Sequence, residues 1–489
     1  MAGAGSGGRG YCFGMALIAG VDSSTQSTKV EIRDLDDGAL VASGSASHPA
    51  TSPPRSEQDP SAWWRAFESA WSEAGSPEVA AISVGGQQHG MVVLDDRGVV
   101  IRDAKLWNDT EAAADADWLL EQLPGRGARW AAVTGTAPVA ALTVAKLSWL
   151  RRNEPDNWAR VAKVILPHDW ITARLTNAPI ESITTDRGDA SGTGYWSAAT
   201  GKYCWDVLAL LDGERDWTGV VPTVLGPLES AGTWGSAVVG PGTGDNMAAA
   251  LGLGLQPGDV VMSFGTSGTV YTVAEAPTAD ESGAVAGYAD ASGRYLPLVC
   301  TMNATRVTDF VARLLAVDHA GFDALALAAP LGAGGLTLLP YLDGERTPNR
   351  PASTGWLSGV RTDATREHVA RAAVEGVVCG LLDGLEALRA QVADARRLVM
   401  VGGGARSAAY RQILADLVDL PVFVASVDQA VATGACVQAA AVLNKEQPSE
   451  VFKRWRLGGG TSVHRSPHCS DDATMAVRSA YAALRDRTA

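Results

Sequence analysis

Two segments far apart in the chain share one pattern, a strand that is interrupted by small polar residues and then resumes. The first is 19-AGVDSSTQSTKVEIRD-34, and the second is 260-VVMSFGTSGTVYTV-273. In each, apolar residues on both sides of a Ser, Thr or Gly-rich turn predict a β-hairpin. Because the same device opens both halves of the chain, the sequence predicts a duplicated fold.

The segments after each hairpin extend this duplication. After the first, 60-PSAWWRAFESAWSEAG-75 has aromatic residues at helical spacing, and 79-VAAISVGG-86 is typical of a buried strand. In the second half, 398–443 alternates strand and helix twice. A three-stranded meander followed by a helix and a strand is how a ribonuclease-H-like layer begins. We therefore expect an α/β protein with two such domains and a cleft between them.

The expected boundaries follow from these segments and from the length. A chain of 489 residues is too long for one compact core. We expect a flexible tail over residues 1–16, an N-terminal domain over 17–245 and a C-terminal domain over 246–489. The region 128–158 is predicted to be helical with a break at a proline, and 203–211 is predicted to be a short helix.

Charge and cysteine usage exclude several classes of function. The net charge of −14 argues against a nucleic-acid partner, and no run of eighteen apolar residues predicts a membrane span. The six cysteines are scattered, without C-x-x-C pairs or metal-ligand spacing. This usage predicts reduced thiols and a cytoplasmic location.

The two turns suit a polyanion. Ser24, Thr25 and Thr28 in the first turn lack bulk, as do Gly265, Thr266 and Ser267 in the second, so backbone N–H and hydroxyl groups can approach phosphates closely. Either turn alone is more typical of an ordinary hairpin, but two at matching positions favour a phosphate clamp. Asp22 ends the first strand where a phosphate-bound Mg²⁺ would arrive, with a turn-capping role as the alternative. The chain has no Walker-A pattern, which excludes a P-loop kinase.

A candidate general base lies in 240-GPGTGDNMAAALGLG-254. Asp245 and Asn246 stand at a Gly-rich turn before an Ala/Leu-rich helix, where the alternative is a simple helix cap. A helix N-terminus is expected to keep Asp245 ionised at neutral pH, as deprotonation of a sugar hydroxyl requires. Gln88 and His89 follow a strand, and Trp107, Asn108 and Asp109 follow in the next turn; these groups offer donors and acceptors to hydroxyls.

A third glycine-rich turn indicates a nucleotide. In 402-GGGARSAAYRQ-412, Gly402, Gly403 and Gly404 follow a strand, and a helix is predicted to begin near Arg406-Ser407. Glycines there let the backbone lie against an adenine or ribose, while the helix N-terminus faces a phosphate.

These motifs together resemble the FGGY family of carbohydrate kinases, within the actin, Hsp70 and hexokinase superfamily. The resemblance runs from about Leu17 to the C-terminus. Its most specific element is 355-GWLSGVRTDATREHVARAAVE-375, which fits the family's C-terminal signature, and 143-TVAKLSWLRRN-153 nearly fits the N-terminal one. The family commonly has Leu-Gly where this chain has Ser23-Ser24. Arg187, which precedes the shared 189-DASGT-193, is not assigned a role by the sequence.

The resemblance implies a set of roles. Asp245 is the catalytic base; Gln88, His89, Asp245 and Asn246 bind a sugar in the N-terminal domain; Asp22 also binds Mg²⁺. ATP is implied as the phosphoryl donor, bound in the C-terminal domain and by the first loop through Asp22, Ser24, Thr25, Thr28, Lys29, Gly265, Thr266, Ser267, Gly402, Gly403, Gly404 and Ser407. Family members that act on D-xylulose resemble the chain most, in the QHG, LWND and DASGT motifs and in the Asp245-Asn246 pair. D-xylulose is therefore the implied substrate, and a homodimer is left open as the assembly.

Two alternatives stay open at this point. The acceptor could be another sugar or polyol, such as ribulose, gluconate or glycerol. A protein of another class with the same fold, an ATPase switch like actin or Hsp70, would use nucleotide binding to change conformation. Gln88, His89, Asp245 and Asn246 together favour a kinase over such a switch. Asp22, Asp245 and the two small-residue loops favour it over a sugar sensor without activity.

Overall fold

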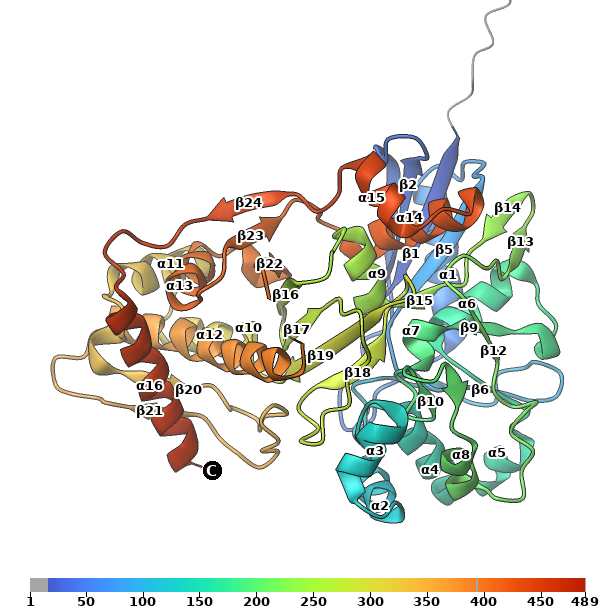
Figure 1. Ribbon diagram of the computed structural model, residues 1–489, viewed down its shortest axis with the longest axis horizontal. Coiled ribbons are helices and arrows are strands. Elements are labelled where there is room, and N and C mark those ends of the chain that lie inside the picture. The colour runs from blue at the N-terminus through green and yellow to red at the C-terminus, as the bar shows by residue number, and fades with distance from the viewer. Residues whose placement is uncertain (1–15, 393–394, 489) are drawn as a thin grey trace, which may run out of the picture.

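The computed structural model describes residues 16–392 and 395–488. The expected N-terminal tail, except for Ala16, lies outside these residues. The described chain forms two lobes, one built mostly from the first half of the sequence and the other from the second (Figure 1).

The first half forms a seven-stranded sheet with the order β13-β14-β5-β1-β2-β3, and β15 extends the edge of β5. Strand β1 is antiparallel to β2 and parallel to β5. The strands are β1 (Leu17–Ser23), β2 (Ser27–Asp34), β3 (Leu40–Ser47), β5 (Ala81–Gly86), β13 (Gly232–Trp234), β14 (Ala237–Val239) and β15 (Thr243–Gly244). Helix α1 (Pro60–Glu73) buries Trp63 and Phe67 in the same apolar cluster as Val30 and Ile32 of β2.

The second half forms a seven-stranded sheet with the order β18-β19-β17-β16-β22-β23-β24. Its strands are β16 (Asp259–Phe264), β17 (Gly268–Thr272), β18 (Ala286–Ala289), β19 (Tyr295–Thr301), β22 (Arg397–Val401), β23 (Val422–Ala425) and β24 (Gly460–Val463). The long helix α12 (Arg366–Gln391) packs its apolar face into the core of this lobe.

The two sheets share one topology. The path β3-β2-β1-β5-β14 corresponds to β19-β17-β16-β22-β23: two antiparallel pairs are followed by two parallel pairs in each. Each path then ends in an antiparallel strand, β13 or β24. The predicted duplicated ribonuclease-H-like fold is therefore confirmed, and the two quoted hairpins are the β1–β2 and β16–β17 pairs.

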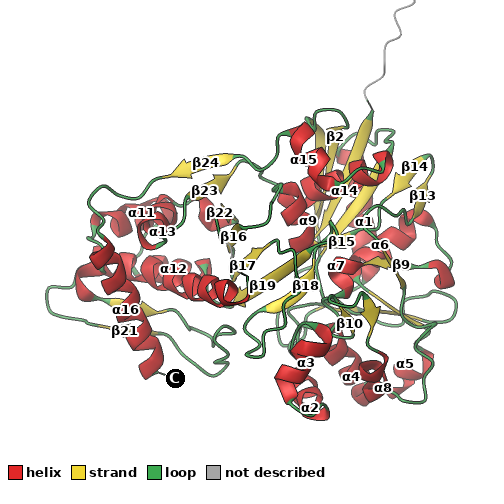
Figure 2. Ribbon diagram, viewed as in Figure 1, coloured by secondary structure: helices red, strands yellow, loops and turns green. Residues whose placement is uncertain are grey.

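The predicted helical regions are also confirmed, with shifted ends. Residues 128–158 fall in α3 (Arg126–Thr134), α4 (Thr143–Asn153) and α5 (Pro155–Arg160), and the predicted helix at 203–211 is α8 (Trp205–Leu211). With α2 (Ala113–Gln122), these helices form a group beside the first sheet (Figures 1 and 2). Their apolar side chains share one buried cluster. No helix in the described ranges is long and apolar enough to cross a membrane.

Two helices, one from the end of the first half and one from the second half, pack with their backbones in direct contact. In α9 (Asp245–Gly252) and α14 (Ala430–Asn444), glycine is required by close approach: a Cβ on Gly434 would lie 1.7 Å from the Ala248 carbonyl oxygen. Helix α14 also packs on β1, where a Cβ on Gly20 would lie 2.0 Å from the Ala432 carbonyl oxygen. A helix from late in the chain therefore covers the first strand (Figure 1). The predicted boundary between residues 245 and 246 falls at the start of α9 and stays a prediction.

Candidate active site

A cleft of about 520 Å³ lies between the two halves. Residues from both line it, among them Asp22, Lys29, Asp245, Asn246, Ser263, Gly402, Gly403, Arg406, Arg411, Asp428 and Gln429. The structure thus brings the candidate base, the candidate metal ligand and the third glycine-rich turn to one cavity.

Asp22 lies at the end of β1 with an unpaired acceptor. Its Oδ1 atom is buried and accepts no hydrogen bond from the described residues, while Oδ2 lies 3.9 Å from Nζ of Lys29, its partner across the hairpin. Lys29 also donates to Oε1 of Gln429 in the other half, at 2.8 Å. Burial raises the pKa of Asp22 to about 6, against the lowering effect of Lys29. A hard cation at Oδ1 would satisfy this oxygen.

Asp245 is the first residue of α9, and one of its two oxygens is held by its neighbour. The backbone N–H and Nδ2 of Asn246 donate to Oδ1 at 2.8 and 2.9 Å. Oδ2 receives no hydrogen bond within the described part of the chain. Burial, with a contribution from Asp22, raises the pKa of Asp245 to about 7. Asp245 is therefore only partly ionised at neutral pH, contrary to the expectation of full ionisation, because burial outweighs the helix N-terminus.

Gln88 completes a hydrogen-bonded chain with the base. Nδ2 of Asn246 donates to Oε1 of Gln88 at 2.8 Å, which leaves the buried Nε2 of Gln88 without an acceptor among the residues described. The chain Asp245–Asn246–Gln88 therefore presents one free acceptor oxygen and one free donor nitrogen.

His89 adds a second acceptor beside this chain. Its Nδ1 lies 2.8 Å from the carbonyl oxygen of Gly192, which can only accept, so Nδ1 carries the proton and Nε2 is the acceptor. Burial, with Lys146 and Arg346 nearby, lowers the pKa of His89 to about 3 and keeps the ring neutral. Nζ of Lys146 donates to the His89 carbonyl oxygen at 2.9 Å, so the family-like segments at 143–153 and 189–193 both hold this residue.

Some residues of the first turn lie near the surface, and others are buried in the core. Oγ1 of Thr25 receives a hydrogen bond from Nε1 of the exposed Trp107 at 2.8 Å and donates to Gln87. Ser24 closes the turn through Ser27. Thr28 is buried, with Oγ1 2.8 Å from Nε2 of His48. Its hydroxyl therefore points into the core rather than into the cleft.

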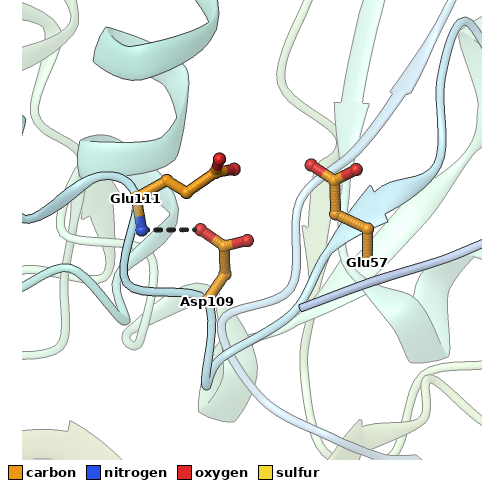
Figure 3. A group of neighbouring side chains, drawn as sticks. All are labelled: Glu57, Asp109 and Glu111. Carbon is orange, nitrogen blue, oxygen red and sulfur yellow. Dashed lines mark hydrogen bonds between the residues drawn. The ribbon is translucent and has the colours of Figure 1, made fainter. Parts of the chain in front are cut away.

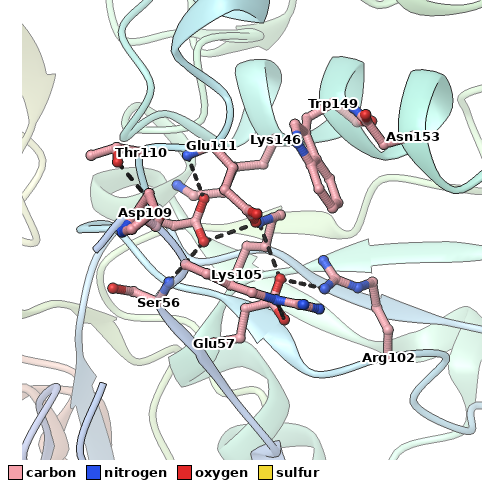
Figure 4. A network of polar contacts seen from close by, with 12 residues as sticks. Ser56, Glu57, Arg102, Lys105, Asp109, Thr110, Glu111, Lys146, Trp149 and Asn153 are labelled. Atoms are coloured by element: carbon pink, nitrogen blue, oxygen red, sulfur yellow. Dashed lines mark hydrogen bonds and ion pairs between the residues drawn. The ribbon is translucent and has the colours of Figure 1, made fainter. Parts of the chain in front are cut away.

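Asp109, predicted beside the sugar pocket, belongs to a separate buried cluster. Asp109, Glu57 and Glu111 bring carboxylate oxygens close enough together to hold a metal ion (Figure 3). Nζ of Lys105 occupies this position instead, 3.0 Å from Asp109, 3.1 Å from Glu57 and 2.6 Å from Glu111, and 3.9 Å from the centre of the Trp149 ring (Figure 4). The cluster, here called the Lys105 cage, is a filled ionic site.

The second turn, Gly265 to Ser267, joins β16 to β17 directly after Ser263 and Phe264. Its backbone carbonyl oxygens accept hydrogen bonds from the start of the next helix. For example, the N–H of Thr305 donates to the carbonyl oxygen of Gly265 at 2.9 Å. Ser263 lines the cleft, whereas the three predicted residues lie just beyond the cleft-lining set.

The third turn places glycine at the cleft by necessity. Gly402 has φ +86°, and a Cβ there would lie 2.8 Å from the Phe264 carbonyl oxygen; Gly403 faces open space. Ser407, predicted to bind nucleotide, instead caps α13 (Ala408–Leu417) and donates to Asp323 at 2.6 Å. Sequence reasoning missed other cleft-lining residues: Ala249, Ser263, Tyr271, Met400, Val401, Ala405, Arg406, Arg411 and most of 424–431. The polar turn after β23, before α14, was the available signal for the last of these.

Arg187 does not reach the candidate sugar site. It begins α7 (Arg187–Ala190), and Nη1 donates to the carbonyl oxygens of Asp290 and Arg294, in the turn between β18 and β19. Arg187 therefore connects the first half to the edge hairpin of the second.

A duplicated fold with a glycine-lined cleft between its halves, to which both halves contribute carboxylate and basic side chains, defines the class of two-lobed phosphotransferases and ATPases. The match to known families is more specific. The model of the N-terminal domain of the FGGY family of carbohydrate kinases matches residues 17–252, and that of the C-terminal domain matches residues 260–443. The chain belongs to the FGGY family of carbohydrate kinases, which confirms the predicted resemblance.

Individual relatives agree. The chain is 44% identical over 471 residues to a xylulose kinase of Streptomyces coelicolor, covering 94% of each chain. Among solved structures it is similar to xylulose kinase from Bifidobacterium adolescentis, with 41% identity, a TM-score of 0.85, and 96% and 99% of the two chains covered. Gluconate kinase from Lactobacillus acidophilus shares the fold, with 22% identity, a TM-score of 0.87, and 97% of each chain covered.

Proposed function

We propose that this enzyme transfers the γ-phosphoryl group of ATP to the 5-hydroxyl of D-xylulose, with Asp245 as general base. The similarity to the xylulose kinases above supports the acceptor. The observation that carries the mechanism is the hydrogen-bonded chain that runs from Asp245 and Asn246 in the interlobe cleft to Gln88 behind them. This chain fixes one carboxylate oxygen of Asp245 and leaves the other free.

Gln88 and His89 do not line the cleft itself, but Gln88 adjoins it through Asn246. This side of Asp245 offers complementary hydrogen-bonding atoms. Oδ2 of Asp245 accepts the proton of the attacking hydroxyl, while Asn246 holds the carboxylate in place. Nε2 of Gln88 is a donor, and Nε2 of His89 is an acceptor, for further hydroxyls of the ketose. Since phosphoryl transfer is largely dissociative, alignment by these groups matters more than the strength of the base.

The other end of the cleft suits the nucleotide. Gly403 leaves space for a flat group, and the guanidinium groups of Arg406 and Arg411 line the same cavity. Mg²⁺ fits the unpaired, buried Oδ1 of Asp22, and when bound it would neutralise phosphate charge. Ser24, Thr25, Lys29 and the second turn stay in the proposed ligand set for ATP. Closure of the lobes would bring their backbone and side-chain groups toward the phosphates.

The proposal includes a cytoplasmic location, since the five described cysteines are free thiols. The assembly is left open between a homodimer and a monomer. Light scattering of the purified protein distinguishes the two.

A coupled kinase assay over D-xylulose, D-ribulose, gluconate and glycerol with Mg-ATP tests the function. D-xylulose is expected to give the highest kcat/KM. Asp245→Ala is expected to lower kcat by about 10²- to 10⁴-fold, the usual contribution of a positioned base, with nucleotide binding retained. Preference for another acceptor would show that the enzyme is a carbohydrate kinase with a different substrate. ATP hydrolysis without phosphorylation of any of the four would favour the ATPase alternative.

A further inference from the structure

A buried cluster directly beneath the proposed site is not used by the mechanism above. His168, at the start of α6 (Pro167–Thr176), is fully buried, and its Nε2 lies 3.2 Å from Asp169, 3.4 Å from Asp186 and 3.4 Å from Asp189. These three carboxylates are buried too, and no lysine or arginine nitrogen in the described ranges comes within 4 Å of them. The four residues are here called the His168 quartet.

The charge state of the quartet follows from its contacts. Burial lowers the pKa of His168, but the three carboxylates outweigh it and raise the pKa to about 9. Burial also raises the pKa of Asp169 to about 6 and that of Asp189 well above its usual range. The groups that face the quartet from farther away are Lys146, Asp245 and three tyrosines, Tyr195, Tyr203 and Tyr288. At neutral pH the imidazole is therefore the cation that compensates this acidic cluster.

The quartet is connected to the base through Asp186. This carboxylate caps α7, accepting from the backbone N–H groups of Gly188 at 2.7 Å and Asp189 at 2.9 Å, and it also accepts from Oγ1 of Thr243 at 2.7 Å. Thr243 lies in β15, two residues before Asp245. One carboxylate thus links the imidazole, the turn that carries Asp189, and the strand that leads into the base.

The imidazole also supports the floor of the sugar site by packing. A Cβ on Gly242 would lie 2.5 Å from Nδ1 of His168, and a Cβ on Gly86 would lie 2.9 Å from Cβ of His168. Gly86 pairs with Gly244 across β5 and β15, so the ring lies behind the two segments that present Gln88 and Asp245. Displacement of the ring would be transmitted to both.

We infer that His168 is a positioning residue for phosphoryl transfer: its cationic ring holds Asp186 and Asp189 together and so fixes Thr243 and the strand that carries Asp245. This inference rests on the proposed function of the cleft. Loss of the charge leaves three buried carboxylates facing one another without a compensating cation, which favours movement of α7 and β15. A small displacement of a reacting group is enough to slow a reaction by about 10²-fold.

Two substitutions separate charge from shape. His168→Gln removes the charge and keeps a similar size, and His168→Lys keeps the charge. We expect His168→Gln to lower kcat by roughly 10- to 100-fold with KM for ATP within about twofold, and His168→Lys to keep kcat within about fivefold of the unmodified enzyme. The matched control is His319→Gln, at an exposed histidine beside Asp309, which is expected to leave kcat unchanged. Equal kcat for the Gln and Lys variants would overturn the inference.

The pH profile gives a readout that a purely structural role would not change. The charge on His168 is present below its pKa and is lost as pH rises through about 9, so kcat of the unmodified enzyme is expected to fall above that pH. The His168→Lys variant is expected to keep its plateau to higher pH. An identical alkaline limb in both proteins would contradict the role assigned to the ring.

Two further measurements keep the inference testable if His168→Gln folds poorly. In the unmodified protein, NMR of ¹³C-labelled histidine is expected to show His168 as a cation at pH 7.5, and a neutral ring would overturn the inference. Asp189→Asn added to His168→Gln is expected to restore kcat at least threefold, because one uncompensated carboxylate is gone. If D-xylulose is not phosphorylated at all, the proposed function fails, and the NMR titration still decides the charge of His168.

Discussion

The Lys105 cage and the His168 quartet each place one nitrogen among three carboxylates, yet their contacts differ. In the cage the nitrogen–oxygen distances are 2.6 to 3.1 Å, and the peptide N–H groups of Ser56 and Glu111 also donate to Asp109. In the quartet the distances are 3.2 to 3.4 Å, and both ring nitrogens of His168 and both oxygens of Asp189 lack hydrogen-bond partners in the described chain.

The difference separates a cluster that serves the fold from one that serves the site. A lysine in short contact with three acids forms strong charge-assisted hydrogen bonds, so its partners are fixed in place. The quartet and the cleft above it, with Asp22 and Asp245, contain unpaired buried groups and carboxylates of raised pKa. Such unpaired groups cost stability, which is tolerated where a ligand or a proton is to be bound.

The largest expected effect comes from Asp245→Asn, which tests the functional side of this comparison. We expect kcat to fall by about 10²- to 10⁴-fold while the free energy of unfolding at pH 8 rises by about 1–3 kcal/mol, because the variant removes a buried charge close to Asp22. Initial rates and urea unfolding measure the two quantities. Lower stability of this variant would show that the carboxylate supports the fold.

Lys105→Met tests the structural role of the Lys105 cage. Lys105 is the cation that contacts all three acids, whereas Arg102 contacts only Glu57 among them. Removing Lys105 is therefore expected to lower the free energy of unfolding by about 3–5 kcal/mol, while the folded fraction keeps most of its kcat. Urea unfolding and active-site-normalised rates provide the readout. Addition of Ca²⁺ is expected to stabilise the variant more than the unmodified protein, since Asp109 and Glu111 then lose their cation next to Glu57, which keeps Arg102. A large loss of kcat in fully folded protein would show that the Lys105 cage contributes to the active site.

The pH dependence sharpens the comparison within the cleft. Because the base must be deprotonated, kcat/KM is expected to fall about tenfold per pH unit below about 7, the pKa of Asp245. Folding raises the pKa values of Asp22 and Asp245, so the native state binds more protons, and their contribution to stability decreases as pH rises from about 4 to 7. The double variant Asp22→Asn/Asp245→Asn should flatten that part of the stability profile. An unchanged profile in the double variant would assign the slope to other groups.

The smallest effect is expected at the edge of the sugar site. His89→Phe removes the acceptor Nε2 but keeps a ring next to Tyr288, so we expect KM for D-xylulose to rise about tenfold with KM for ATP unchanged. Steady-state kinetics with each substrate varied measures this. An unaltered KM for the sugar would remove His89 from the pocket.

The sequence was sufficient for features that depend on short segments. The two hairpins, the helix at 60–75 and the Gly-rich turn before Asp245 have local signals, and duplication made their topology predictable. Contacts between distant segments had no such signal. His168 meets Asp186 and Asp189 only after the chain folds, and 167-PHDW-170 is typical of an ordinary helix start.

The misplaced site residues have the same origin. Ser407 precedes a helix and follows three glycines, a pattern shared by phosphate-binding turns and by simple caps; Asp323, from a distant helix, makes it a cap. Thr28 lies in a phosphate-like turn, but its place in strand β2 directs the hydroxyl toward His48. The pKa of Asp245 depends on burial by both lobes, which no local pattern records.

The packing of α14 on β1 has a consequence for how the protein is made. Gly20, Ser83 and Glu31 of the first sheet contact residues of α14: Ser83 donates to Gln438, and the Glu31 carbonyl oxygen accepts from Cys436. During synthesis that face of the sheet stays uncovered until residue 444 has left the ribosome. A fragment ending near residue 245 is therefore expected to be prone to aggregation, and supplying the missing helix in trans should rescue it.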